Sequence, residues 1–339
     1  MPASKKGPAL SLWRHRGYLA VFVALGVALG VLLGGLAVRG QGWSKIADAL
    51  SSVSFLALAP AFAVFLLGIF LRTLRWRLLL TGQPIGVGRL FLVQNAGIGL
   101  NSVSPVRWVS EPVQFGLLTV RDRLPAGVLV ATMTVDRGMD LVVTLVAMGV
   151  AIAVFPPLAP YAPYVAVGAG VVLVGIVALV IGGLAAGSLP WLQQAPVAGR
   201  FIAALKALRA SPGRLMAALA LSFLYWGLVG ASGWLLLSAL GLHRSLPKGI
   251  VAVLAATFFS GWVPGLPGAV GTFEFVGVTV LELWGVAQAK ALVWAALTHL
   301  VLFLPSVVIA AVVLPAEGIL TWKSLQALMQ RGRQRVAPS

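Results

Sequence analysis

Charged side chains inside apolar segments are the residues of this sequence that are best placed to do chemistry. The chain has only eight Asp and Glu residues among 339, and half of them fall in or beside long apolar runs. An ionisable side chain at membrane depth costs about 2.5–3.5 kcal/mol on insertion scales, so it is a functional hypothesis by default. Together with two arginines of the same segments, the set is Glu111, Asp136, Asp140, Glu274, Arg107 and Arg137.

The two arginines have the right chemistry to bind a phosphate group. A guanidinium can hold phosphate through two parallel hydrogen bonds, which an ammonium cannot do. We therefore predict that Arg107 and Arg137 contact the head group of a lipid, with Glu111 and Asn95 beside them. For Arg137 a structural ion pair with Asp140, one helix turn further on, is an equal alternative.

The acids permit two interpretations. Asp136 and Asp140 are four residues apart and share one helix face. Without partners, these two side chains and Glu274 could carry protons through the membrane. With partners, they would form a closed polar network that locks the helices, and the sequence leaves both possibilities open.

A loop rich in glycine and proline, Pro264-Gly-Leu-Pro-Gly-Ala-Val-Gly-Thr-Phe-Glu274, precedes the last of these acids. Glycine permits tight turns and close backbone approach, and it leaves backbone amides exposed. We predict that Gly268 and Gly271 lie against the substrate. A plain interhelical loop is the alternative.

The elements that position these residues must be membrane helices. Apolar residues make up 60% of the chain and charged residues 10%, whereas soluble proteins carry about 25% charged residues. The net charge of +17 alone would suggest a nucleic-acid partner, but so little polar surface excludes a soluble globule. The absence of cysteine excludes thiol chemistry, and three scattered histidines indicate no metal site. We expect an all-α transmembrane bundle without a metal or cofactor.

Six apolar runs are long enough to cross the roughly 30 Å hydrocarbon core, which takes about 20 helical residues. They are residues 18–38, 53–71, 126–155, 164–186, 215–240 and 291–314. The first run resembles a signal peptide but is too long and lacks a cleavage site, so we expect an uncleaved anchor.

Two further apolar regions, residues 89–120 and 249–285, are broken by Pro, Gly and polar residues. Each half has about 14–17 residues, or about 21–25 Å of helix, which is short of a full crossing. This pattern predicts two re-entrant hairpins. Two full spans in each region would keep the same topology and remain the alternative.

The distribution of basic residues sets the orientation. Most of the 25 Lys and Arg residues fall on one predicted side, so we place both termini in the cytoplasm of a multi-pass plasma-membrane protein. The hairpins then enter from opposite sides, as in inverted-repeat transporters. We predict one membrane domain, with halves at 18–186 and 215–320, a cytoplasmic linker at 188–214 and a basic tail at 321–339.

Over about residues 43–320 the chain resembles the lysylphosphatidylglycerol synthase transmembrane-region family, also called the flippase-like family, and four blocks carry the resemblance. They are Arg72-Thr-Leu-Arg-Trp-Arg-Leu-Leu-Leu80, the stretch from Asn95 to Glu111, Asp136-Arg137 with Asp140, and the Gly/Pro loop ending at Glu274. The sequence departs at Ser110, where the family often has Gly, and at Pro112-Val-Gln114, where it has a basic residue. The soluble aminoacyl-transfer domain of the synthases is not in the sequence, so we do not expect lipid lysylation.

The resemblance implies movement of a phospholipid or lipid-linked head group between leaflets, with anionic membrane lipids as partners. We place Arg72, Arg75 and Trp76 at the lipid interface, either snorkelling or recruiting lipid. Two alternatives are an intramembrane lipid-phosphate transferase and a non-transporting subunit that recruits a lipid-modifying enzyme. We do not expect an enzyme, and the sequence indicates no protein partner.

Overall fold

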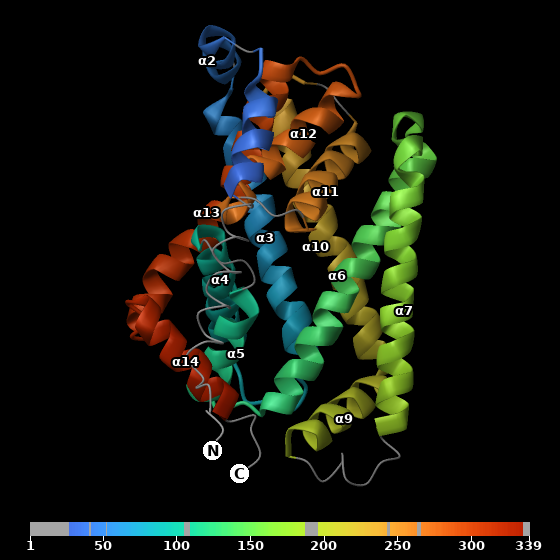
Figure 1. Cartoon of the computed structure of the whole chain (residues 1–339), viewed down its shortest axis with the longest axis vertical. Coiled ribbons are helices and arrows are strands. Elements are labelled where there is room, and N and C mark those ends of the chain that lie inside the picture. Colours follow the sequence, from blue (N-terminus) through green and yellow to red (C-terminus); the bar gives the residue numbers. More distant parts are fainter. Residues whose placement is uncertain are drawn as a thin grey trace, which may run out of the picture.

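The computed structural model describes residues 27–40, 42–51, 53–104, 109–186, 196–242, 245–262 and 266–334. Within these ranges the regular structure is helical throughout and contains no strand (Figure 1). The predicted all-α membrane bundle is thus confirmed.

Five described stretches are long and apolar enough to cross a membrane. They belong to α3 (Phe55–Leu79), α6 (Ala126–Val154), η1 (Pro156–Tyr161) with α7 (Ala162–Ala186), α10 (Pro212–Ala239) and α13 (Gln288–Ala316). They coincide with five of the six predicted runs. The remaining run is described from Val27 onward, as the apolar helix Val27–Val38.

The surface of α7 shows what surrounds the bundle. Val167, Val171 and Val174 are each about two-thirds exposed, on a helix that stands beside α6 at one edge of the molecule (Figure 1). A large exposed apolar surface of this kind is stable only against a membrane or another protein. The chain is therefore a multi-pass membrane protein.

The end of α3 differs from the prediction. The sequence placed the end of this span at residue 71, but the helix continues for two more turns to Leu79. The extension carries Arg72 and Arg75 into the bundle, where both side chains are buried. The physical reason is that acids on α6 neutralise the buried charge, as described below.

The two broken regions form two pairs of short helices. The first pair is α4 (Val87–Val103) and α5 (Ser110–Val120), and the second is α11 (Leu246–Trp262) and α12 (Thr272–Glu282), preceded by η2 (Pro267–Ala269). At 1.5 Å per residue the first helix of each pair, with 17 residues, is about 25 Å long, and the second, with 11 residues, is about 16 Å long. The two helices of each pair pack against each other, so the predicted breaks lie where the sequence placed them.

Two apolar clusters fill the bundle, and polar residues separate them. On α3, Phe65 and Ile69 belong to one cluster and Trp76 and Leu79 to the other, with Arg75 between them. Because the layer between the clusters is polar, its side chains must find hydrogen-bond partners inside the protein.

The same order recurs on α13, where Trp294 belongs to the first cluster and Val313 to the second. Ser306 lies buried between Val301 of the first cluster and Ala310 of the second, and His299 is buried two turns earlier, among residues of the first cluster. This helix also packs closely on α4, because a Cβ at Gly99 would collide with the backbone carbonyl of Ser306. The polar layer therefore crosses the tight α4–α13 contact.

Three amphipathic or polar helices complete the fold. Helix α2 (Trp43–Ser51) packs on α13, α9 (Pro196–Arg209) crosses the first turns of α6, and α14 (Trp322–Gln334) packs on α5. At the end of the first helix pair, Arg89 forms ion pairs with Asp122 and Glu317, which join α4 to the C-terminal end of α13.

Candidate functional site

Arg75 is the centre of a buried ion network. Its side chain is 0% exposed. Its Nε donates to Asp136 Oδ1 at 2.7 Å, while Nη1 and Nη2 donate to the two carboxylate oxygens of Asp140 at 2.6 and 3.2 Å. Nη1 also donates to the hydroxyl of Ser222 at 3.0 Å. Charge-assisted and bidentate bonds of this kind are among the strongest in proteins.

Three helices hold this network in place. The i,i+4 spacing on α6 aims both aspartates at α3, as the sequence predicted from the shared helix face. Helix α10 contributes Ser222 and also Trp226, whose indole N–H donates to Asp140 Oδ1 at 3.0 Å. The charges are thus enclosed by α3, α6 and α10.

Arg137 extends the network to the surface. Its Nη2 donates to Glu111 Oε1 at 2.6 Å, and its Nη1 lies 3.8 Å from Asp140 Oδ2. The Arg137 and Glu111 side chains are 44% and 39% exposed, although Arg137 lies about 17 Å along α6 at 1.5 Å per residue. Accessible charges at membrane depth face a bundle interior or a wet cavity rather than lipid tails. Arg137 thus has two acidic partners. The predicted pairing with Asp140 is the longer, at 3.8 Å, and the pairing with Glu111 is the shorter, at 2.6 Å.

Arg72 is a third cation beside this network, and two of its guanidinium nitrogens make no hydrogen bond to the described residues. Its Nη1 lies 3.4 Å from the Tyr225 hydroxyl, and its guanidinium carbon lies 5.6 Å from the centre of that ring. Its Nε and Nη2 are buried and have no hydrogen-bond partner among the described residues. A buried unpaired donor costs about 1–3 kcal/mol, so this guanidinium retains unused capacity for an anion or a water molecule.

The charges of this cluster balance. Three arginines face three carboxylates, so their formal charges sum to zero when all are ionised. The members, hereafter the charged network, are Arg72, Arg75, Arg137, Glu111, Asp136 and Asp140.

The prediction that Arg72, Arg75 and Trp76 lie at the lipid interface is wrong. All three are buried, and the indole N–H of Trp76 donates to the hydroxyl of Thr132 at 3.3 Å. Sequence reasoning missed Arg75 as a cation at depth. The available signal was the charge count, because the buried acids outnumbered the two arginines that the sequence placed near them.

Glu274 forms a second polar site, at the start of α12. One carboxylate oxygen accepts the backbone N–H of Gly271 at 2.7 Å, and the other lies 2.6 Å from Nδ1 of His299 on α13. The imidazole packs between the rings of Phe273 and Phe303. His299 is thus a hydrogen-bonded core residue.

The loop before α12 meets the end of α4. Gly268 has φ +67°, and a Cβ there would lie 2.8 Å from the carbonyl oxygen of Ser102. Gly271 has φ +83°, and a Cβ there would collide with the carbonyl of Gly30 in the first helix. The close backbone approach expected of both glycines is found, and it is made to neighbouring helices. The loop before α12 therefore meets both the end of α4 and the first helix.

The remaining predicted residues lie elsewhere. Asn95 is fully buried; its oxygen accepts from Ser306 on α13 at 3.2 Å and its amide donates to the carbonyl of Phe91. It joins helices and does not line an open path in this structure. The side chain of Asn101 accepts the backbone N–H of Val109 at 3.2 Å, which caps the break. Arg107 lies outside the described residues.

The described residues contain no group of three His, Asp or Glu side chains that could hold a metal ion. No curated protein matches the chain. A model of one family, the transmembrane region of lysylphosphatidylglycerol synthase, matches residues 23–310. The polytopic helical bundle and the family model agree, and the chain belongs to the lysylphosphatidylglycerol synthase transmembrane-region family, which ties this membrane protein to lipid handling.

Proposed function

We propose that this protein moves the head group of an anionic phospholipid between the two leaflets of the plasma membrane. In this proposal α4–α5 and α11–α12 are re-entrant hairpins that enter from opposite sides and meet in the bilayer. The observation that carries it is the charged network, because six charges lie among membrane helices, and the three that are buried, Arg72, Arg75 and Asp136, need a purpose that repays their desolvation.

The accessible end of the network is the proposed head-group contact. Arg137 is the exposed cation, and its nearest partner, Glu111, begins the helix after the first break. A phosphate that arrives there replaces Glu111, which accepts a single hydrogen bond from Arg137, since a guanidinium can bind phosphate through two parallel hydrogen bonds. Arg75 stays paired with both aspartates and keeps Asp140 close to Arg137 throughout. Arg107, which precedes Glu111 in sequence, is the second proposed phosphate contact.

The pairing of the acids bears on the energy source. Asp136 and Asp140 each bond to Arg75, which supports a locked polar network rather than proton carriage for these two groups. Glu274 and His299 share a hydrogen bond beside the loop that meets the end of α4. If transport is proton-coupled, this pair is the proposed carrier.

Leaflet exchange of a fluorescent phosphatidylglycerol in reconstituted vesicles tests the proposal. We expect Arg137→Gln to slow exchange by roughly 10- to 150-fold, the equivalent of one lost charge-assisted hydrogen bond of about 1.5–3 kcal/mol. Arg121→Gln is the matched control, because this side chain lies at a helix end and bonds to Glu317 outside the charged network.

Two outcomes contradict the site assignment. The first is exchange at the wild-type rate in Arg137→Gln, Arg107→Ala and Glu274→Gln proteins that elute as folded species. The second is an equal loss in Arg121→Gln. Product formation from a lipid phosphate by the purified chain would instead favour the transferase alternative.

A further inference from the structure

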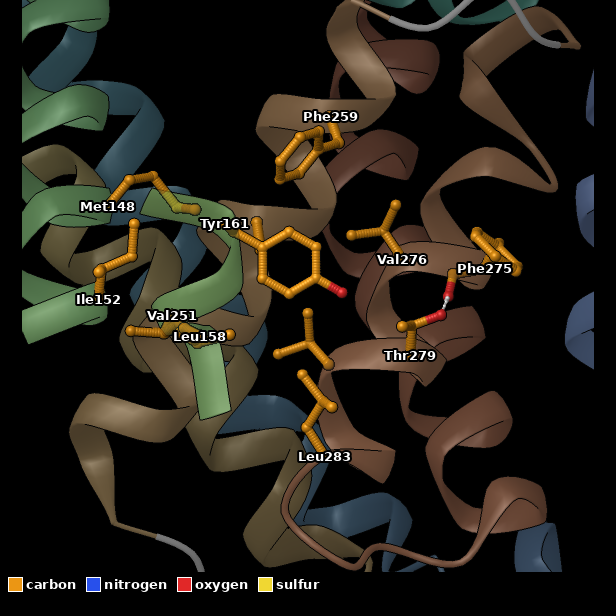
Figure 2. Close-up of a pocket in the computed structure, with 12 residues that line it drawn as sticks. Met148, Ile152, Leu158, Tyr161, Val251, Phe259, Phe275, Val276, Thr279 and Leu283 are labelled. Carbon is orange, nitrogen blue, oxygen red and sulfur yellow. Dashed lines mark hydrogen bonds between the residues drawn. The ribbon is translucent and has the colours of Figure 1, made fainter. Parts of the chain in front are cut away.

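An apolar pocket of about 170 Å³ lies between α6 and η1 on one side and α11 and α12 on the other (Figure 2). Its walls include Ile152, Tyr161, Val251, Phe259, Val276 and Leu283. Tyr161 and Leu283 are each more than a third exposed, so the pocket opens at the surface of the bundle. It begins two turns beyond Asp140 on α6 and is separate from the charged network.

The lining of the pocket selects an apolar occupant. Of the lining residues only Thr279 and Tyr161 carry hydroxyls, and the Thr279 hydroxyl donates to the Phe275 carbonyl at 2.8 Å. The Tyr161 hydroxyl points toward Val276 and Thr279 (Figure 2). A water molecule needs two to four polar partners, so a site of this composition does not hold ordered water well.

The shape of the pocket fits a lipid chain. From Val251 to Phe259 it follows α11 for eight residues, or about 12 Å at 1.5 Å per residue. Half of the hydrocarbon core is about 15 Å thick. The pocket therefore extends over most of the depth of one leaflet, with Val251 and Leu283 at the end nearer the helix termini.

A cation stands at that end. Lys248 lies one turn before Val251 on the same face of α11, and its Nζ is 5.7 Å from the centre of the Trp284 ring. Trp284 packs in turn on Phe155, with ring centres 5.4 Å apart. All eight acids of the chain lie in described segments, and none of them forms an ion pair with Lys248. An aromatic side chain and a free cation are typical of the membrane–water interface.

We propose that this pocket binds one acyl chain of an anionic phospholipid, with the lipid phosphate on Lys248. The site is a second lipid contact that no part of the transport proposal requires. The occupant follows from an apolar slot one leaflet deep, a surface opening beside lipid-facing helices, and an unpaired cation at its end. Lipid binding in this pocket does not depend on leaflet exchange. A failure of either proposal therefore leaves the other untouched.

The experiment uses phosphatidylglycerol with a photoreactive diazirine on one acyl chain, diluted into phosphatidylcholine vesicles that contain the full chain. After irradiation, mass spectrometry maps the labelled peptides. We expect labelling around Tyr161 and Thr279 to saturate as the probe fraction rises, whereas labelling on α7 rises in proportion. Val276→Trp fills the pocket and abolishes the saturable component. Val171→Trp makes the same change at a position of α7 that is 67% exposed and leaves it intact.

The contact between Lys248 and the lipid head group is tested by comparing an anionic with a zwitterionic lipid. Lys248→Gln should weaken labelling by phosphatidylglycerol roughly fivefold, the effect of one basic residue near an anionic surface. It should leave labelling by phosphatidylcholine with the same acyl chain unchanged. If Val276→Trp fails to fold, Ala255→Leu fills the same pocket from α11 with a smaller side chain.

Three outcomes overturn the proposal. One is labelling of the pocket that rises in proportion to the probe and is insensitive to both filling variants. Another is equal labelling by the two lipids in wild type, which contradicts a preference of Lys248 for a head group of net negative charge, since both lipids carry a phosphate. The third is cross-linking between two protein chains at these residues by a separate bifunctional reagent, which assigns the pocket to a second copy of this chain.

Discussion

Replacing Arg75 by methionine should be the most destabilising single substitution in the polar layer. The change removes a fully buried guanidinium that makes four hydrogen bonds to three side chains. Asp136 then loses the cation to which it bonds, and Asp140 keeps the Trp226 indole at 3.0 Å and Arg137 at 3.8 Å. Removing one partner of a buried ion pair costs about 3–5 kcal/mol, and we expect the loss to fall in this range.

Charge balance makes the prediction specific. The charged network sums to zero, so Arg75→Met leaves it at −1 and Asp136→Asn leaves it at +1. The double variant restores zero. Coupled sites of this kind differ from additivity by about 0.5–3 kcal/mol, so the double variant should lose less stability than the sum of the two single variants.

The measurement is the free energy of unfolding in mild-detergent micelles titrated with sodium dodecyl sulfate, followed by tryptophan fluorescence. Asp136→Asn alone should cost less than Arg75→Met, because Arg75 then keeps both of its bonds to Asp140. Loss of less than about 1 kcal/mol in Arg75→Met, or strict additivity in the double variant, contradicts the assigned pairing.

Three further substitutions test the packing and the ion pairs outside the charged network. Gly99→Ala should destabilise by about 1–3 kcal/mol, because the added methyl group meets the Ser306 backbone, which cannot rotate away. Gly138→Ala, whose Cβ would meet nothing within 4 Å, should instead stabilise the helix by about 0.5–1 kcal/mol; equal effects at the two sites contradict the close α4–α13 contact. Glu317→Gln, which removes a partly exposed ion pair with Arg89, should cost less than about 1 kcal/mol and less still in high salt. A loss as large as that of Arg75→Met would show that this cluster is as important as the charged network.

The two helix pairs pack differently on the rest of the bundle. Helix α4 of the first pair is in close contact with its neighbour, whereas the apolar pocket lies between α11 of the second pair and its neighbour. Helix α4 of the first pair lies so close to α13 that Gly99 has no room for a Cβ. The corresponding helix of the second pair, α11, faces α6 across the apolar pocket. In an inverted repeat these two contacts would be equivalent. In the transport proposal, an unequal pair is expected of either of the two conformations.

The elements that depend on local pattern could be predicted from the sequence. The long spans follow from runs of about 20 apolar residues, and the two breaks follow from clusters of Pro, Gly and polar residues. The shared face of Asp136 and Asp140 follows from helix geometry alone. The end of α3 could not be predicted, because a run that reaches Arg72 looks finished until the acids that neutralise Arg75 are known.

The sequence by itself therefore determined that this is a helical membrane protein, where most of its helices run and break, and which two aspartates share a helix face. Only the tertiary structure decided the partners of those aspartates and of Glu274. Arg75 is 61 residues from Asp136, and His299 is 25 residues from Glu274. The reason is geometric: each residue turns a helix by about 100°, so pairing depends on the rotation and depth of neighbouring helices, which only their mutual packing sets.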